Sequence, residues 1–159
     1  MTGPAWAAAL EATALGAWMR SSGWAYPAVN LLHLLGLVLL VGSMVLLDLR
    51  LLGAGRRLPL PAVSALLTPV AAAGLLIMLP SGALLFTADA GPLSVQPMLQ
   101  LKLLWIALGL ANALLFCGWW GGRLADWDAR PPLLGRVQAA ASLLIWLGVA
   151  AMGRLIAYV

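Results

Sequence analysis

The stretch YPAVNLLHLLGLVLLVGSMVLLDLRLLG, residues 26–53, decides the fold. It is apolar over more than the roughly 20 residues that a helix needs to cross a bilayer. It carries the chain's single histidine, His33, one helical turn after Asn30, and it ends in Asp48 and Arg50. Polar side chains inside an apolar span are costly and therefore mark sites of interest.

The composition of the chain places it in a membrane. Of its 159 residues, 64% are hydrophobic and 9% are charged, whereas soluble domains carry about 25% charged residues. The net charge of +4 does not indicate a nucleic-acid partner, because the arginines are scattered over loops and form no patch. The lone cysteine, Cys117, excludes an internal disulfide and any multi-cysteine metal site within one chain.

Further apolar stretches follow the first one, separated by short loops rich in turn residues. We predict an all-α integral membrane protein, a four-helix antiparallel bundle in a single domain over residues 1–159. An amphipathic helix over residues 5–20, with tryptophans at headgroup level, is expected to lie in the membrane interface. Pro80 is expected to break the second span. The predicted spans cover about residues 24–52, 60–87, 97–120 and 133–158.

The arginines and the lysine predict the orientation of the bundle. Six basic residues lie on the side of the 53–61 and 121–132 loops and three lie on the opposite side. The positive-inside rule then places these two loops in the cytoplasm. The expected location is the bacterial inner membrane, with both termini in the periplasm.

Polar side chains on three spans are expected to form one layer in the outer half of the membrane. At 1.5 Å per residue, His33 lies roughly 13 Å below the outer boundary, Lys102 roughly 8 Å and Arg154 roughly 6 Å. Asn30 is one turn from His33 and is expected to share its face. The sequence therefore predicts a candidate ligand layer of Asn30, His33, Lys102 and Arg154.

Two interpretations of this layer stay open. In the structural one, Lys102 and Arg154 extend to the headgroups, and Asn30 and His33 bond neighbouring helices. In the functional one, the layer binds a cofactor: haem b with His33 as the metal ligand, or a quinone bonded by His33 and Lys102. A single histidine precludes bis-histidine ligation within one chain, so a haem would need another ligand type or a partner chain.

A second polar layer is expected at the cytoplasmic end of the spans. Asp48 and Arg136 are predicted to form an ion pair between helices, beside Arg50, and Asn112 is predicted to bond to another helix. We interpret these residues as structural. The sequence shows no nucleophile triad, phosphate loop, paired carboxylates or metal-ligand cluster, so we do not expect an enzyme.

Four blocks of the sequence resemble a known family. The family comprises small bacterial four-helix membrane proteins and is a domain-of-unknown-function family, similar in general appearance to the membrane bundles of copper-resistance D proteins and b-type cytochromes. Many members carry a histidine after an Asn-x-x-x-Phe block, where this chain has Cys117. The resemblance implies the fold and the outer polar residues, but no activity. The blocks are residues 26–53, SGALLF (81–86), LQLKLLWIALGLANALLF (99–116) and SLLIWLGVAAMGRLIAY (142–158).

We expect a small non-catalytic inner-membrane protein that serves as an accessory subunit or partner of a larger membrane complex, with electron transfer as the setting. Its partners would be the lipid bilayer and either other membrane subunits or further copies of itself. The first alternative is a haem b- or quinone-binding electron-transfer protein. The second is a small transporter or proton path that uses His33 and Lys102 and acts as an oligomer.

Overall fold

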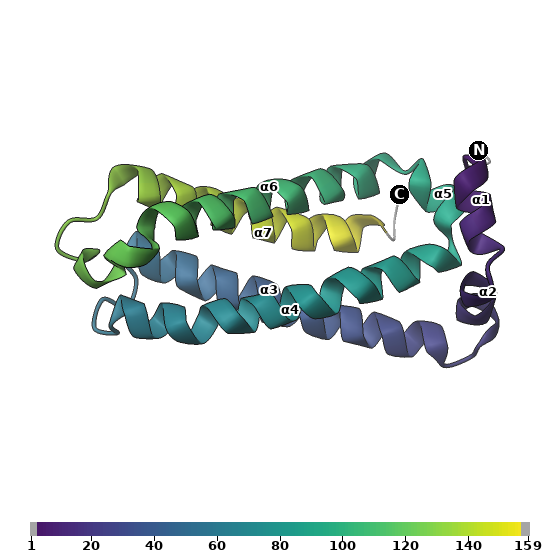
Figure 1. Cartoon of the computed structure of the whole chain (residues 1–159), viewed down its shortest axis with the longest axis horizontal. Coiled ribbons are helices and arrows are strands. Elements are labelled where there is room, and N and C mark those ends of the chain that lie inside the picture. Colours follow the sequence, from purple (N-terminus) through teal and green to yellow (C-terminus); the bar gives the residue numbers. More distant parts are fainter. Residues whose placement is uncertain (1–2, 157–159) are drawn as a thin grey trace.

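The computed structural model describes residues 3–156, and these residues form helices and no strands. This confirms the predicted all-α class. Figure 1 shows the long helices lying lengthwise, with the short ones gathered at the two ends of the molecule. The elements are α1 (Ala5–Glu11), α2 (Ala14–Ser21), α3 (Ala25–Leu52), α4 (Leu60–Ala88), α5 (Ala90–Ser94), α6 (Pro97–Trp120), the 3₁₀ helix η1 (Gly121–Asp126) and α7 (Leu133–Leu155).

Four helices, α3, α4, α6 and α7, are long and apolar enough to cross a membrane, as predicted. At 1.5 Å per residue, the 28 residues of α3 span about 42 Å and the 23 residues of α7 about 35 Å. Both lengths exceed the hydrocarbon core of a bilayer, about 30 Å. The predicted end of the last span at Tyr158 lies outside the described residues.

The N-terminal segment differs from the single helix predicted over residues 5–20. It forms two helices, α1 and α2, because the Thr13 hydroxyl accepts a hydrogen bond from the Gly16 backbone N–H at 3.2 Å and so starts a new helix. The Arg20 guanidinium donates to the carbonyls of Glu11 at 2.7 Å and Ala88 at 3.1 Å. These bonds hold the two short helices against the end of α4.

The closest packing between long helices joins α3 to α4 through two glycines. A Cβ atom added to Gly74 would lie 2.5 Å from the Leu40 backbone nitrogen and 2.7 Å from the Gly36 carbonyl oxygen. A Cβ atom added to Gly36 would lie 2.8 Å from the Gly74 carbonyl oxygen. Only glycine allows backbones to approach this closely, and in a bilayer such contacts replace the hydrophobic effect as the source of helix association.

The remaining long helices pack as a second pair, α6 against α7, and α7 also packs against α3. Side chains from all four helices meet in two buried clusters, one in the middle of the molecule and one toward the end with η1. The cores of these clusters are Leu40, Ala71, Met78, Trp146 and Val149, and Leu47, Leu51, Leu60, Trp127 and Ala139.

Helix α4 continues through both Pro69 and Pro80, where the sequence predicted a break at Pro80. Proline lacks a backbone N–H and so leaves a carbonyl of the preceding turn without its usual donor. In the next residue, the Ser81 hydroxyl donates to the Ile77 carbonyl at 2.6 Å. This side-chain bond adds a donor to the turn that the proline weakens, and the helix is maintained.

We predict that Gly36→Ala destabilises the protein by about 2 kcal/mol relative to Gly42→Ala, because the added methyl group forces α3 and α4 apart. Gly42 lies on the same helix with nothing within 4 Å of its added Cβ, so both variants share the gain in helix propensity. Equilibrium unfolding in mixed micelles measures the difference. Equal stability of the two variants would show that the glycine contact does not hold the helices together.

Candidate functional site

The imidazole of His33, on α3, faces α4 in the half of the molecule near α1 and α2. Its Nδ1 atom lies 3.0 Å from the Ser81 hydroxyl oxygen. The ring fits because residue 82 is glycine: a Cβ atom there would come within 3.0 Å of the His33 Cε1 atom. The adjacent residues Ser81 and Gly82 thus give the ring a bonding partner and the space that it needs.

The bonds of Ser81 determine which His33 nitrogen carries the proton. Because the Ser81 hydroxyl donates its hydrogen to the Ile77 carbonyl, it accepts from His33 Nδ1–H. In the neutral imidazole, the Nε2 atom then keeps its lone pair. This atom can accept a hydrogen bond or bind a metal ion.

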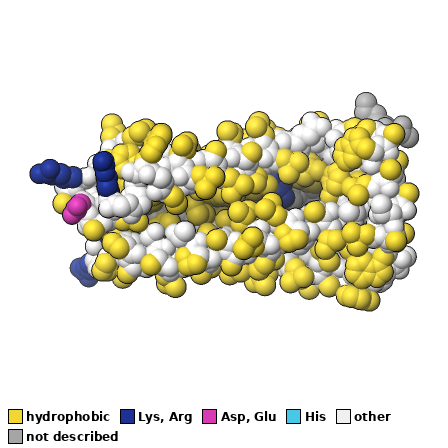
Figure 2. Space-filling model, viewed as in Figure 1, with side chains coloured by type: hydrophobic (Ala, Val, Ile, Leu, Met, Phe, Trp, Pro, Cys, Tyr) yellow, Lys and Arg dark blue, Asp and Glu magenta, His cyan; other side chains and the backbone are white. Residues whose placement is uncertain are grey.

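Lys102, on α6, lies half-buried beside α7. A Cβ atom added to Gly153 would lie 3.4 Å from the Lys102 ammonium nitrogen. Lys102 interacts electrostatically with His33, and no carboxylate of the described residues pairs with it. Figure 2 shows a hollow between α6 and α4, with a basic side chain inside it.

The other two members of the predicted layer, Asn30 and Arg154, are exposed. Three helical residues rotate a side chain by about 300°, so Asn30 is turned some 60° away from His33. Arg154 is the residue after Gly153, and one helical residue rotates a side chain by about 100°, so Arg154 lies off the face that meets Lys102. The layer was predicted on the condition that its residues point inward, and Asn30 and Arg154 are exposed in the structure. We call His33, Ser81 and Lys102 the outer site, after the side of the membrane predicted for them from the sequence.

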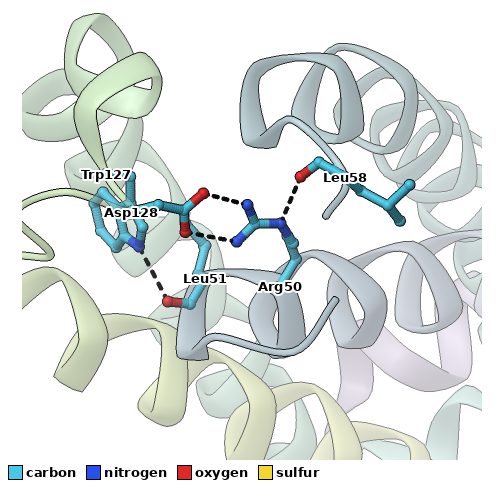
Figure 3. A network of polar contacts seen from close by, with 5 residues as sticks. All are labelled: Arg50, Leu51, Leu58, Trp127 and Asp128. Atoms are coloured by element: carbon cyan, nitrogen blue, oxygen red, sulfur yellow. Dashed lines mark hydrogen bonds and ion pairs between the residues drawn. The ribbon is translucent and has the colours of Figure 1, made fainter. Parts of the chain in front are cut away.

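A different set of polar contacts closes the opposite end of the molecule, shown in Figure 3. Arg50, which is 4% exposed, pairs with both carboxylate oxygens of Asp128, at 2.9 Å for Nη1 to Oδ1. Its Nε atom donates to the Leu58 carbonyl at 2.9 Å. The neighbouring indole of Trp127 donates to the Leu51 carbonyl at 3.0 Å. One arginine thus ties both loops at this end to α3.

The predicted ion pair between Asp48 and Arg136 is absent from this network. Asp48 is 2% exposed and lies beside Ser142 of α7, while Arg136 is exposed. The Asp48 Oδ2 and Ser142 Oγ atoms have no hydrogen-bond partner among the described residues. The carboxylate that reaches this end comes instead from Asp128, because the loop after η1 folds back over α3.

Asp48 and Ser142 border a cavity of about 70 Å³ between the four long helices, which Cys117 and Asn112 also line. The Asn112 amide donates to the Gln138 carbonyl at 3.1 Å, and the Trp120 indole donates to the Gln138 side-chain oxygen at 2.6 Å. These bonds tie α6 to α7.

Sequence reasoning did not identify the roles of Ser81, Asp128 and Gln138. Ser81 follows a proline inside an apolar span, and Gln138 is the only amide in the last span. Each is a polar side chain in a helix that otherwise has few polar side chains. This isolation could have identified them from the sequence. Asp128 carried no such signal, because its role depends on the path of a loop.

The described residues contain no group of three or more His, Cys, Asp and Glu side chains that could hold a metal ion. Comparison of the chain with family models, curated proteins and solved structures finds no match. The chemistry available at the outer site is that of one cationic donor, Lys102, and one imidazole, His33. Together they can bind a small ligand in which an acceptor atom bonds Lys102 and a hydroxyl group or a metal centre bonds His33.

We predict that the stability of the protein falls as the pH drops below about 4. The Arg50 hydrogen bonds lower the pKa of Asp128, so this pair stabilises the folded state above the ordinary carboxyl range and is lost as the pH falls through the lowered pKa. Asp128→Asn is expected to be less stable near neutral pH and to lose less on acidification. Thermal unfolding in nanodiscs at several pH values measures this.

The matched control for this experiment is Asp126→Asn, which removes an exposed carboxylate two residues earlier in the same region. It should keep the acid sensitivity of the unchanged protein. If Asp128→Asn and Asp126→Asn behave alike, the Arg50 pair is not the source of the pH dependence.

Proposed function

We propose that the four long helices cross the bacterial inner membrane as an antiparallel bundle, with both termini outside. The arginine-rich loops support this orientation, because basic residues favour the cytoplasmic side. In this arrangement, α1 and α2 lie in the outer interface. Trp6 and Trp18 are exposed there, as suits side chains at headgroup level.

We further propose that the protein is a non-catalytic accessory subunit that binds a helix of a larger membrane complex along α6. The observation that supports this proposal is the weak burial of α6. Among its 24 residues, Gly109 is the only one that is buried. Helix α6 packs against α7 and has little contact with α4. An open side of this kind accepts either lipid chains or another helix.

The lone Cys117 provides a direct test, because it is exposed on α6. A photo-cross-linker attached to it in native membranes is expected to join the chain to one defined membrane protein, which also co-purifies in mild detergent. The control carries the cross-linker on the exposed α3 position of Val38→Cys in a Cys117→Ser background. Cross-linking to lipid alone from Cys117, with a monomeric purified protein, would reject the subunit proposal.

A second candidate function is electron transfer through a ligand at the outer site, supported by the geometry of His33. Its Nε2 lone pair can accept a hydrogen bond from a quinol hydroxyl, while Lys102 donates to the ligand's other oxygen. The same lone pair suits a haem iron, since the Ser81 bond orients the ring as outer-shell bonds do for metal-bound histidines. A haem would take its second ligand from another chain or stay five-coordinate.

Protein purified from native membranes tests this candidate by its absorbance spectrum and by mass spectrometry of extracted quinones. We expect a Soret band or one bound quinone per protein. His33→Ala is expected to lower the amount of bound haem or quinone by about tenfold or more, because the imidazole bonds the ligand directly. Asn30→Ala, which changes an exposed residue of the same helix, should retain the ligand. A colourless preparation without quinone would eliminate this function.

A further inference from the structure

The turn between α6 and α7 contains a hollow that the functions proposed above do not use. It has a volume of about 270 Å³. Its lining residues lie at the end of α6, in η1 and in the turn that leads to α7. Figure 2 shows Lys and Arg side chains gathered at this end of the molecule. The lining residues are Trp120, Arg123, Asp126, Arg130 and Pro132.

The two arginines of the hollow have no carboxylate partner among the described residues. The guanidinium carbon of Arg123 lies 5.7 Å from the ring centroid of Trp120, whose indole is itself held by Gln138. Asp128, the next acidic residue along the chain after Asp126, is paired with Arg50. The hollow therefore presents two guanidinium groups against one carboxylate, that of Asp126.

The position of the hollow places it where lipid headgroups lie. It is at the end of α6 and the start of α7, both of which are long and apolar enough to span a membrane. Tryptophans mark this level, with Trp119 exposed and Trp120 half-buried, as in the aromatic belts of membrane proteins. Basic pockets at the cytoplasmic ends of spans bind anionic headgroups, and arginine matches the geometry of phosphate oxygens.

We propose that this hollow binds the headgroup of an anionic phospholipid, phosphatidylglycerol. Arg123 and Arg130 contact its phosphate, with Arg123 oriented by stacking on Trp120. Asp126 accepts hydrogen bonds from the hydroxyl groups of the headgroup glycerol, which is why a hydroxyl-bearing headgroup suits this hollow better than a headgroup with a further carboxylate. The lipid chains continue along the apolar surface of α6.

The experiment compares lipid retention in native mass spectrometry of the full chain released from nanodiscs. The nanodiscs contain equal parts of phosphatidylglycerol and phosphatidylcholine. We expect one phosphatidylglycerol to stay bound, and the double variant Arg123→Gln/Arg130→Gln to retain it about tenfold less. Arg56→Gln/Arg57→Gln removes the same charge from exposed residues of the other loop at this end and should retain the lipid.

The outcomes separate the alternatives. Equal loss in the two double variants would show that only the general charge of this end attracts lipid, and would overturn the proposal. Displacement of the lipid by millimolar inorganic phosphate would show that the site recognises free phosphate. A second set of nanodiscs contains phosphatidylserine in place of phosphatidylglycerol, and retention of phosphatidylserine equal to that of phosphatidylglycerol would overturn the role of Asp126. Thermal unfolding of each variant in phosphatidylcholine alone establishes that the variants are folded.

Discussion

The close contact between α3 and α4 at Gly36 and Gly74 is the constraint on which the rest of the structure depends. Water does not drive these helices together in a bilayer, so backbone contact and polar bonds must do so. The same contact sets the rotation of both helices. It brings His33 against Ser81 and Gly82, and the outer site exists because of this alignment.

The polar side chains near the two ends of the molecule differ in how they are hydrogen-bonded. At the arginine-rich end, Arg50 bonds both carboxylate oxygens of Asp128 and the Leu58 carbonyl, which fixes the loops. Asp48 and Ser142, which lie toward the same end, each keep an atom without a hydrogen-bond partner among the described residues. At the other end, Lys102 and the free nitrogen of His33 keep bonding capacity that the described residues do not use. A satisfied network stabilises, whereas unused donors and acceptors in a low-dielectric medium favour a ligand. The combination of a cation and an imidazole is why we place the proposed electron-transfer site at Lys102 and His33.

Some of this arrangement followed from individual residues. His33 and Lys102 stand out because each is an ionisable residue in an apolar span, and depth along the helix predicts that they lie at a similar level. Asn30 and Arg154 satisfy the same depth criterion, yet they are exposed. The depth of a residue depends only on its position along the helix. The direction in which its side chain points also depends on the rotation of the helix about its axis, which is set by contacts with neighbouring helices. The ion pair between Asp48 and Arg136 was predicted from depth alone, and it is absent for the same reason.

The sequence by itself determined the helical class and the four long apolar helices, because the length and apolarity of a segment are local properties. It also marked Pro80 as a position where a helix was open to interruption. The structure decided that α1 and α2 separate, that α4 continues through Pro80, and that Asp128 rather than Asp48 forms the ion pair at the end with η1. The Arg50–Asp128 bonds join residues far apart in the chain, and such bonds form only once the helices have packed. The other two outcomes depend on the Thr13 and Ser81 hydroxyl groups, whose bonding partners lie within one helical turn and do not follow from the length or apolarity of a segment.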